Sequence, residues 1–171
     1  MVAAIELFLD VDATRRIRTL WQALEAEGVP TLATLLEQKH RPHVSLAVAR
    51  TLPPADVVSA LDGLRVAVPL ELGLDFVGQF VGRVLWLGVT PTAELLAHHA
   101  AVQERLSAAG VEPWDLYRPG RWVPHCTVSM RVPNPLMAVA IRRCLEMLPV
   151  RAVVSGASVT DHANGVAQAL P

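Results

Sequence analysis

The sequence predicts a single domain of mixed α and β structure that is built from two similar halves. Its 171 residues favour one domain, and a hydrophobic content of 52% with a mean hydropathy of +0.36 suffices for a packed core. The order strand, helix, loop, strand and short helix occurs twice along the chain. Each occurrence contains one copy of a short motif, Pro42–Leu46 in the first half and Pro124–Val128 in the second.

In the first half, alternation over residues 4–9 predicts a strand with Glu6 and Phe8 on the face opposite an apolar row. Asp12 is expected to cap the helix that follows, which should end near Gly28. The remaining elements of this half are an uncertain stretch over 31–38, a strand over 43–49 and a short helix from Pro53 to Gly63.

In the second half, alternation predicts a strand that places Leu70, Leu72, Leu74 and Phe76 inside. The glycines at positions 78 and 82 are expected to bracket the turn of a β-hairpin with a loop longer than two residues. The remaining elements are a return strand over 84–89, a helix from Thr90 to Gly110, a loop over 112–121, a strand over 122–130, a helix over 134–148 and a last strand near 151–160.

Composition excludes several classes of protein. The formal net charge is −1 with a single lysine, which argues against a long nucleic-acid track but leaves room for a small ligand or an RNA end. Apolar segments stop well short of the roughly 20 residues that span a bilayer, and the N-terminal segment does not resemble a secretory signal. We therefore expect no membrane contact, a cytoplasmic location and a monomer. Cys126 and Cys144 have no metal-binding spacing.

The two motifs are the most informative feature of the chain. Each has a proline, a histidine, any residue, a small hydroxyl residue and an aliphatic residue. Because side chains alternate along a strand, His43 shares a face with Ser45, and His125 shares a face with Thr127. Each copy therefore places an imidazole and a hydroxyl on one face, with apolar residues behind them. Two copies at equivalent places predict two histidines facing each other across a cleft.

Two such histidines suit acid–base chemistry at a phosphodiester. A neutral imidazole accepts a proton near pH 7 and an imidazolium donates one, so one ring can deprotonate water while the other protonates the departing oxygen. The hydroxyls of Ser45 and Thr127 can hydrogen-bond the non-bridging phosphate oxygens. This chemistry requires no metal ion and no other cofactor. Which histidine is the base and which the acid stays open.

The paired motifs resemble the signature of the two-histidine phosphoesterase superfamily, and within it the branch of 2′-5′ RNA ligase-like proteins and cyclic phosphodiesterases. The segment from Phe76 to Leu96 is also similar to that branch. The resemblance implies an α+β fold of two pseudo-symmetric lobes, each a mostly antiparallel sheet with helices outside, around a central cleft. Residues 1–171 then form a single domain, with lobes over approximately 1–64 and 65–171 between which strands can be exchanged.

The resemblance also implies an enzyme that hydrolyses 2′,3′-cyclic or 2′-5′ phosphodiesters of RNA ends or nucleotides without a metal ion, or ligates RNA in the reverse direction. His43 and His125 match the catalytic histidines of the family, and Ser45 and Thr127 match its phosphate-binding hydroxyls. Further candidates for substrate contacts are Tyr117 for stacking on a base, Arg118 and Arg121 for a phosphate, and Phe8 for the cleft floor.

Two alternatives remain open at this stage. A binding module could hold a nucleotide or RNA end in the same cleft without turnover. A metal hydrolase could use both histidines as ligands, but the chain lacks a third ligand at convincing spacing. His98 and His99 are adjacent on a helix and point about 100° apart, so we expect His99 to pack in the core rather than bind a metal.

Overall fold

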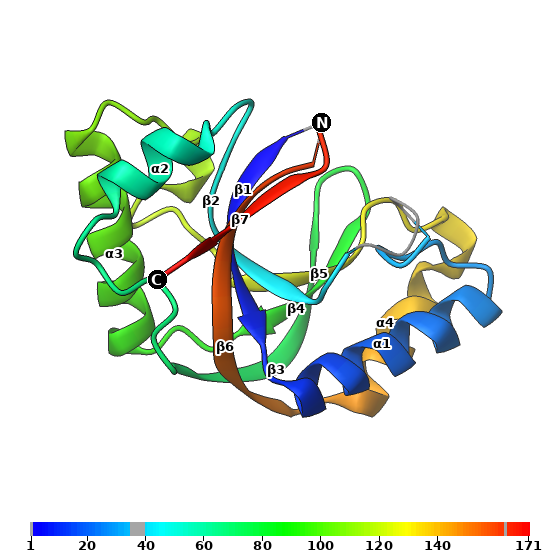
Figure 1. Cartoon of the computed structure of the whole chain (residues 1–171). Coiled ribbons are helices and arrows are strands. Elements are labelled where there is room, and N and C mark those ends of the chain that lie inside the picture. The colour runs from blue at the N-terminus through cyan, green and yellow to red at the C-terminus, as the bar shows by residue number, and fades with distance from the viewer. Residues whose placement is uncertain (1, 35–39, 163) are drawn as a thin grey trace.

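A computed structural model describes residues 2–34, 40–162 and 164–171, which form a curved antiparallel sheet with helices on its outer faces (Figure 1). The strands are β1 (Ala3–Leu9), β2 (His43–Ala49), β3 (Glu71–Phe80), β4 (Val84–Val89), β5 (His125–Ser129), β6 (Val150–Asp161) and β7 (Val166–Leu170). The helices are α1 (Val11–Ala26), α2 (Pro54–Ala60), α3 (Ala93–Ala108) and α4 (Met137–Met147), with short 3-10 turns η1 (Asp115–Tyr117) and η2 (Asn134–Leu136).

The sheet follows the order β2-β1-β6-β3-β4-β5, with β7 paired to β6. Every strand pair in it is antiparallel. The long strand β6 joins the two halves, because its residues up to Val153 pair with β3 whereas Val154 and the residues after it pair with β1. The α+β fold with antiparallel sheets that the family resemblance implies is therefore confirmed, and the repeated order of elements lies on either side of β6.

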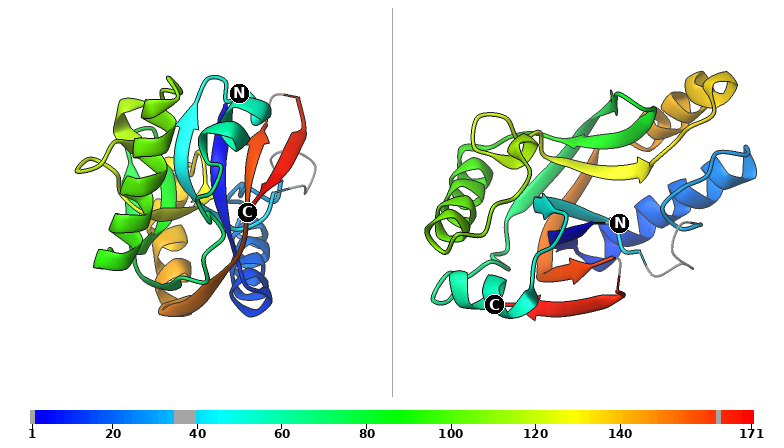
Figure 2. Two further views of the ribbon diagram at one scale, coloured as in Figure 1. Left: turned by 60° about the vertical axis from the view of Figure 1, so that its left-hand side comes forward. Right: turned by 90° about the horizontal axis from the view of Figure 1, so that it is seen from above.

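The helices pack in pairs, each of which combines a helix of the first half with a helix of the second. Helices α1 and α4 pack together beside one end of the sheet, and α2 and α3 pack together at the opposite end (Figures 1 and 2). Helix α1 buries Ile17, Trp21 and Leu24 completely, and these residues recur at the spacing of one helix face. On β1, Ile5, Leu7 and Leu9 are 0–1% exposed.

The start of α1 differs from the sequence prediction. Asp10, not Asp12, caps the helix, since its Oδ1 accepts hydrogen bonds from the backbone N–H groups of Asp12 and Ala13 at 3.0 Å. Its second oxygen accepts from the backbone N–H of Val153 at 2.6 Å, which ties the start of the helix to β6. Only one residue, Asp10, separates the end of β1 from the start of α1, so this first carboxylate after the strand occupies the N-cap position.

The β3–β4 hairpin contains the second correction. The alternation predicts Phe76 inside, but its side chain is 41% exposed, because a β-bulge between Leu74 and Phe76 reverses the alternation. Gly78 does not bracket the turn; it lies within β3 opposite Trp86, whose ring occupies the space that a Cβ at position 78 would need. The turn itself is the three residues 81–83, as the prediction of a longer loop requires.

The remaining differences concern the C-terminal end and one loop. The strand predicted near 151–160 is present as β6 but is not the last strand, since β7 follows it and pairs with it. Residues 35–38 of the uncertain stretch over 31–38 lie outside the described residues. No helix in the described part of the chain is long and apolar enough to cross a membrane.

Candidate active site

The two motif strands lie at opposite ends of the sheet order, yet they are in contact with each other. The indole N–H of Trp122, just before β5, donates to the backbone carbonyl of Ser45 on β2 at 3.0 Å. Cys126 on β5 lies near the backbone of His43, and this backbone opposes the effect of burial, which raises the pKa of the thiol to about 12. The curvature of the sheet therefore brings its two edges together (Figure 2).

Both histidines are held in the same way. The Nδ1 of His43 lies 2.7 Å from the carbonyl oxygen of Arg41, and the Nδ1 of His125 lies 2.6 Å from the carbonyl oxygen of Val123. A carbonyl oxygen can only accept, so Nδ1 bears the hydrogen in each ring. The proline between each carbonyl and its histidine fixes the intervening backbone in an extended conformation. Each ring therefore presents Nε2 as the atom that is free to exchange a proton.

The alternation predicted for the two motif strands is present. Val44, Leu46, Cys126 and Val128 are fully buried, whereas both histidines and both hydroxyl residues are partly exposed on the other face. Within the described residues, the hydroxyls of Ser45 and Thr127 make no hydrogen bond, and both therefore remain available to a ligand. The structure thus brings two imidazoles and two free hydroxyls onto strands that meet.

Glu6 is a residue of this site that sequence reasoning placed on the correct face but did not identify as functional. Its side chain is only 4% exposed, and its Oε1 lies 2.7 Å from the Nε2 of His162 and 3.4 Å from the Nε2 of His43. Its Oε2 accepts a hydrogen bond from the hydroxyl of Thr160 at 3.0 Å. The sequence signal that could have identified Glu6 is an acidic residue within an otherwise apolar strand. The structure adds that this strand pairs in register with the motif strand β2.

The charges around Glu6 favour its ionised form. Burial alone would raise the pKa of this carboxyl, but a positive charge on His43 and the contacts with His162 and Thr160 lower it below its usual value. In return, the hydrogen bond to Glu6 raises the pKa of His162. The ring of His40 lies 4.9 Å from that of His162, and burial together with the charges of the neighbouring histidines lowers its pKa to about 4. His40 is therefore neutral at pH 7, while Glu6 and His162 form an ion pair in mildly acidic solution.

His125 has a different environment, made of aromatic rings. Its ring centroid lies 4.9 Å from that of Phe80 in an edge-to-face arrangement and 5.6 Å from that of Trp86. Burial lowers the pKa of His125, the hydrogen bond to Val123 partly opposes this, and a positive charge on His43 lowers it further. The two halves of the site therefore differ: an acidic partner adjoins His43, and an apolar wall adjoins His125.

The other predicted substrate contacts have varied surroundings. Phe8 pairs in register with His43, and the guanidinium of Arg41 lies 4.4 Å above its ring, so it does border the first motif. Tyr117 is half-buried against the core, and burial raises its pKa to about 12. Arg118 and Arg121 both form ion pairs with Asp115, and the three side chains are more than half exposed.

The remaining histidine predictions concern packing. His99 is 1% exposed and stacks on Trp122, with ring centroids 4.0 Å apart and planes 7° apart, so its predicted role in packing is confirmed. Burial lowers its pKa to about 4. Among the described residues, no group of three histidine, cysteine or carboxylate side chains is arranged to hold a metal ion.

Comparison with known proteins places this geometry in context. A family model described as the 2′-5′ RNA ligase superfamily matches residues 15–166. No curated protein sequence matches the chain. The crystal structure of Escherichia coli LigT in apo form is 20% identical with a TM-score of 0.59, and the alignment covers 99% of this chain and 93% of LigT. A crystal structure described as a phosphoesterase is 17% identical with a TM-score of 0.61 over 99% and 93% of the two chains. The complex of LigT with 3′-AMP is 20% identical with a TM-score of 0.57 over 99% and 92%. At these identities the solved structures share the fold.

Proposed function

This chain belongs to the 2′-5′ RNA ligase superfamily, and we propose that it is a metal-independent phosphodiesterase that acts on 2′,3′-cyclic or 2′-5′ phosphodiesters of RNA ends or nucleotides. The observation that carries this proposal is the pair of motif histidines, each with its Nδ1 hydrogen held by a backbone carbonyl and its Nε2 left to exchange a proton. Membership of a phosphoesterase superfamily and the complex of LigT with the nucleotide 3′-AMP support it.

The unequal surroundings of the rings support an assignment of roles. Because burial lowers the pKa of His125, this ring is neutral at pH 7 and suited to accept a proton as the general base. The Glu6 carboxylate, 3.4 Å from the Nε2 of His43, forms an ion pair with that ring when it carries a proton. His43 is therefore the general acid of the hydrolytic direction.

Hydrolysis of a 2′,3′-cyclic phosphate then proceeds by in-line displacement. The Nε2 of His125 takes a proton from water while the water oxygen bonds to phosphorus. The bond from phosphorus to one ribose oxygen breaks, and the Nε2 of His43 gives its proton to that oxygen. The hydroxyls of Ser45 and Thr127 donate to the non-bridging oxygens as charge develops on them. Exchange with solvent returns the protons to their starting places. A ribose hydroxyl of a second nucleotide that takes the place of water in the same sequence opens the cyclic phosphate to a phosphodiester, because its oxygen bonds to phosphorus as the bond to one ribose oxygen of the cyclic phosphate breaks.

The test uses phosphorus NMR of the purified protein with 2′,3′-cyclic AMP and with a 2′-5′-linked dinucleotide. We expect conversion to a phosphomonoester, unchanged by a chelator, and near-complete loss of product in His43→Ala and His125→Ala. His98→Ala is the matched control, because this histidine lies on α3, outside the motif strands. Activity that survives either motif substitution would refute the mechanism. Nucleotide binding without product would instead indicate the binding module.

A further inference from the structure

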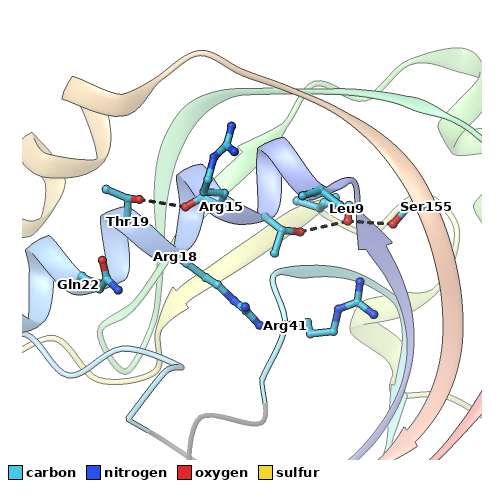
Figure 3. A pocket seen from close by; sticks show the side chains of 9 residues that line it. Leu9, Arg15, Arg18, Thr19, Gln22, Arg41 and Ser155 are labelled. Carbon is cyan, nitrogen blue, oxygen red and sulfur yellow. Dashed lines mark hydrogen bonds between the residues drawn. The ribbon is translucent and has the colours of Figure 1, made fainter.

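A hollow lined by arginines lies beside the first motif, and we propose that it binds an additional phosphate group of the substrate. This inference rests on the proposed function, and it narrows the substrate to one that has a second phosphate near the reacting one. The hollow has a volume of about 560 Å³ and lies between α1 and the segment just before β2 (Figure 3). Its polar wall contains three arginines, Arg15, Arg18 and Arg41.

One wall of the hollow is a single face of α1. Arg15 lies three residues before Arg18 and four before Thr19, and Gln22 lies four residues after Arg18 and three after Thr19, so the four residues share one face of the helix. The opposite face of the same helix is the buried apolar stripe that holds it against the core. Because α1 is anchored in this way, the arginines extend from a fixed support, and Figure 3 shows Arg18 reaching from the helix toward the side on which Arg41 lies.

The charge of the hollow is positive. Arg15 forms an ion pair with Asp12 at 2.8 Å, with both side chains largely exposed. Neither Arg18 nor Arg41 has a carboxylate within ion-pair distance among the described residues, and no acidic residue of that part of the chain lines the hollow. Guanidinium groups bind phosphate oxygens through paired, charge-assisted hydrogen bonds. The two arginines without a carboxylate partner therefore give this surface a preference for a phosphate dianion or diester.

The hydroxyl groups of the hollow are already engaged. Those of Thr14 and Ser155 donate to the backbone carbonyl of Leu9 at 3.1 and 2.9 Å, and that of Thr19 donates to the carbonyl of Arg15 at 3.1 Å. Their hydrogens are therefore not available to an anion, and the affinity has to come from the arginines. Substitution of an arginine is for this reason the appropriate test.

Arg41 connects the hollow to the reacting histidines. Its backbone carbonyl holds the Nδ1 of His43 at 2.7 Å, while its guanidinium lies over the ring of Phe8 and lines the hollow. Phe8 in turn pairs in register with His43. A substrate with its reacting phosphorus between the motif histidines can thus extend past Phe8 and place a neighbouring phosphate on Arg18 and Arg41. That phosphate belongs either to the next linkage of an RNA chain or to the 5′-phosphate of the same nucleotide.

The experiment compares three probes: 2′,3′-cyclic AMP, the same nucleotide with a 5′-phosphate, and a dinucleotide that ends in a 2′,3′-cyclic phosphate. We expect kcat/KM of the wild type to be higher for at least one of the two probes with an additional phosphate, and which of them gains identifies the source of that phosphate. In Arg18→Ala this preference should fall about tenfold, because one charge-assisted contact to the additional phosphate is lost. The slope of log(kcat/KM) against the logarithm of the salt concentration should become shallower by about one unit for that probe. Arg18→Lys should restore part of the preference.

Arg142→Ala is the matched control, since it removes the same charge from the exposed face of α4. Equal preferences in Arg18→Ala and Arg142→Ala, or no preference in the wild type, would overturn the inference while leaving the proposed function intact. If the wild type converts none of the probes, the proposed function fails. Calorimetric titration of the dinucleotide then decides the inference alone: weaker binding to Arg18→Ala than to Arg142→Ala supports it, and equal binding overturns it.

Discussion

Replacement of Glu6 by glutamine tests the electrostatic asymmetry of the site. The carboxylate is 4% exposed and lies 2.7 Å from the Nε2 of His162, so glutamine keeps the shape but removes the charge from a buried pair. Two unit charges at that distance attract by about 6 kcal/mol at an effective dielectric constant of about 20. Desolvation offsets much of this, and breaking a buried pair from one side costs about 3 kcal/mol in practice. We therefore expect Glu6→Gln to lower the free energy of unfolding by about 3 kcal/mol where the pair is charged.

The pH dependence of this loss follows from the two pKa shifts. The pKa of Glu6 is lowered on folding, so its contribution is fully present above its unfolded value of 4.5 and is lost as pH falls through the folded value. The pKa of His162 is raised, so its contribution is fully present below its unfolded value of 6.5 and is lost as pH rises through the folded value. The cost of Glu6→Gln should therefore be largest between pH 4.5 and 6.5 and smaller at pH 9.

Urea unfolding of wild type and variant at a series of pH values from 4 to 9 measures this cost. Glu71→Gln is the control, because Glu71 is an exposed carboxylate at the start of β3, and it should change stability by less than about 0.5 kcal/mol throughout. A cost of Glu6→Gln that is constant with pH, or larger at pH 9 than at pH 6, would refute the reasoning. The proton titration of His162, followed by NMR, should also move to lower pH in the variant.

Three further predictions concern turnover and packing. His125→Ala should reduce kcat by about 10²–10⁴-fold with a small effect on KM. In the wild type, the low-pH limb of kcat/KM should have its midpoint below 6.5, because the pKa of this base is lowered. A midpoint above 6.5 would contradict the assignment of His125 as the base. Ser45→Ala and Thr127→Ala should each reduce kcat by about 10²-fold. An increase in KM with kcat unchanged would contradict this, because it would show that these hydroxyls stabilise the bound substrate and the transition state equally. Gly88→Ala places a Cβ against the ring of Phe76 and should destabilise the fold by about 1–3 kcal/mol in thermal unfolding; an unchanged melting temperature would show that the ring is free to move.

Local patterns in the sequence predict the strands β1 to β6 and the faces of the motif residues correctly. Alternation and apolar anchors depend on neighbouring residues, so the partial exposure of His43 and Ser45 above the buried Val44 and Leu46 follows from the sequence. The inner face of α3, including His99, is predicted correctly for the same reason. The antiparallel pairing itself is not contained in these patterns, since alternating strands and helices equally favour a parallel sheet, and it comes from the family resemblance.

Long-range contacts account for what the sequence does not predict. The acidic residue Glu6 acquires its role only when β1 pairs with both β2 and β6, which brings His162 from the other end of the chain to its carboxylate. The bulge that exposes Phe76 depends on the pairing of β3 with β4, and strand β7 is short and largely exposed, so neither leaves a clear periodic signal. The hollow beside α1 likewise requires Arg41 to lie opposite a helix that is distant in sequence.

The most direct test of the two-histidine mechanism is a crystal structure with a bound phosphate or nucleoside vanadate, in which the distances from its oxygens to the motif side chains are measured. We expect one anion with oxygens within about 3.2 Å of the Nε2 atoms of both His43 and His125, and of the hydroxyls of Ser45 and Thr127. An anion that contacts only one of the two histidines, or that binds with the Nε2 atoms too far apart to share it, would contradict the mechanism.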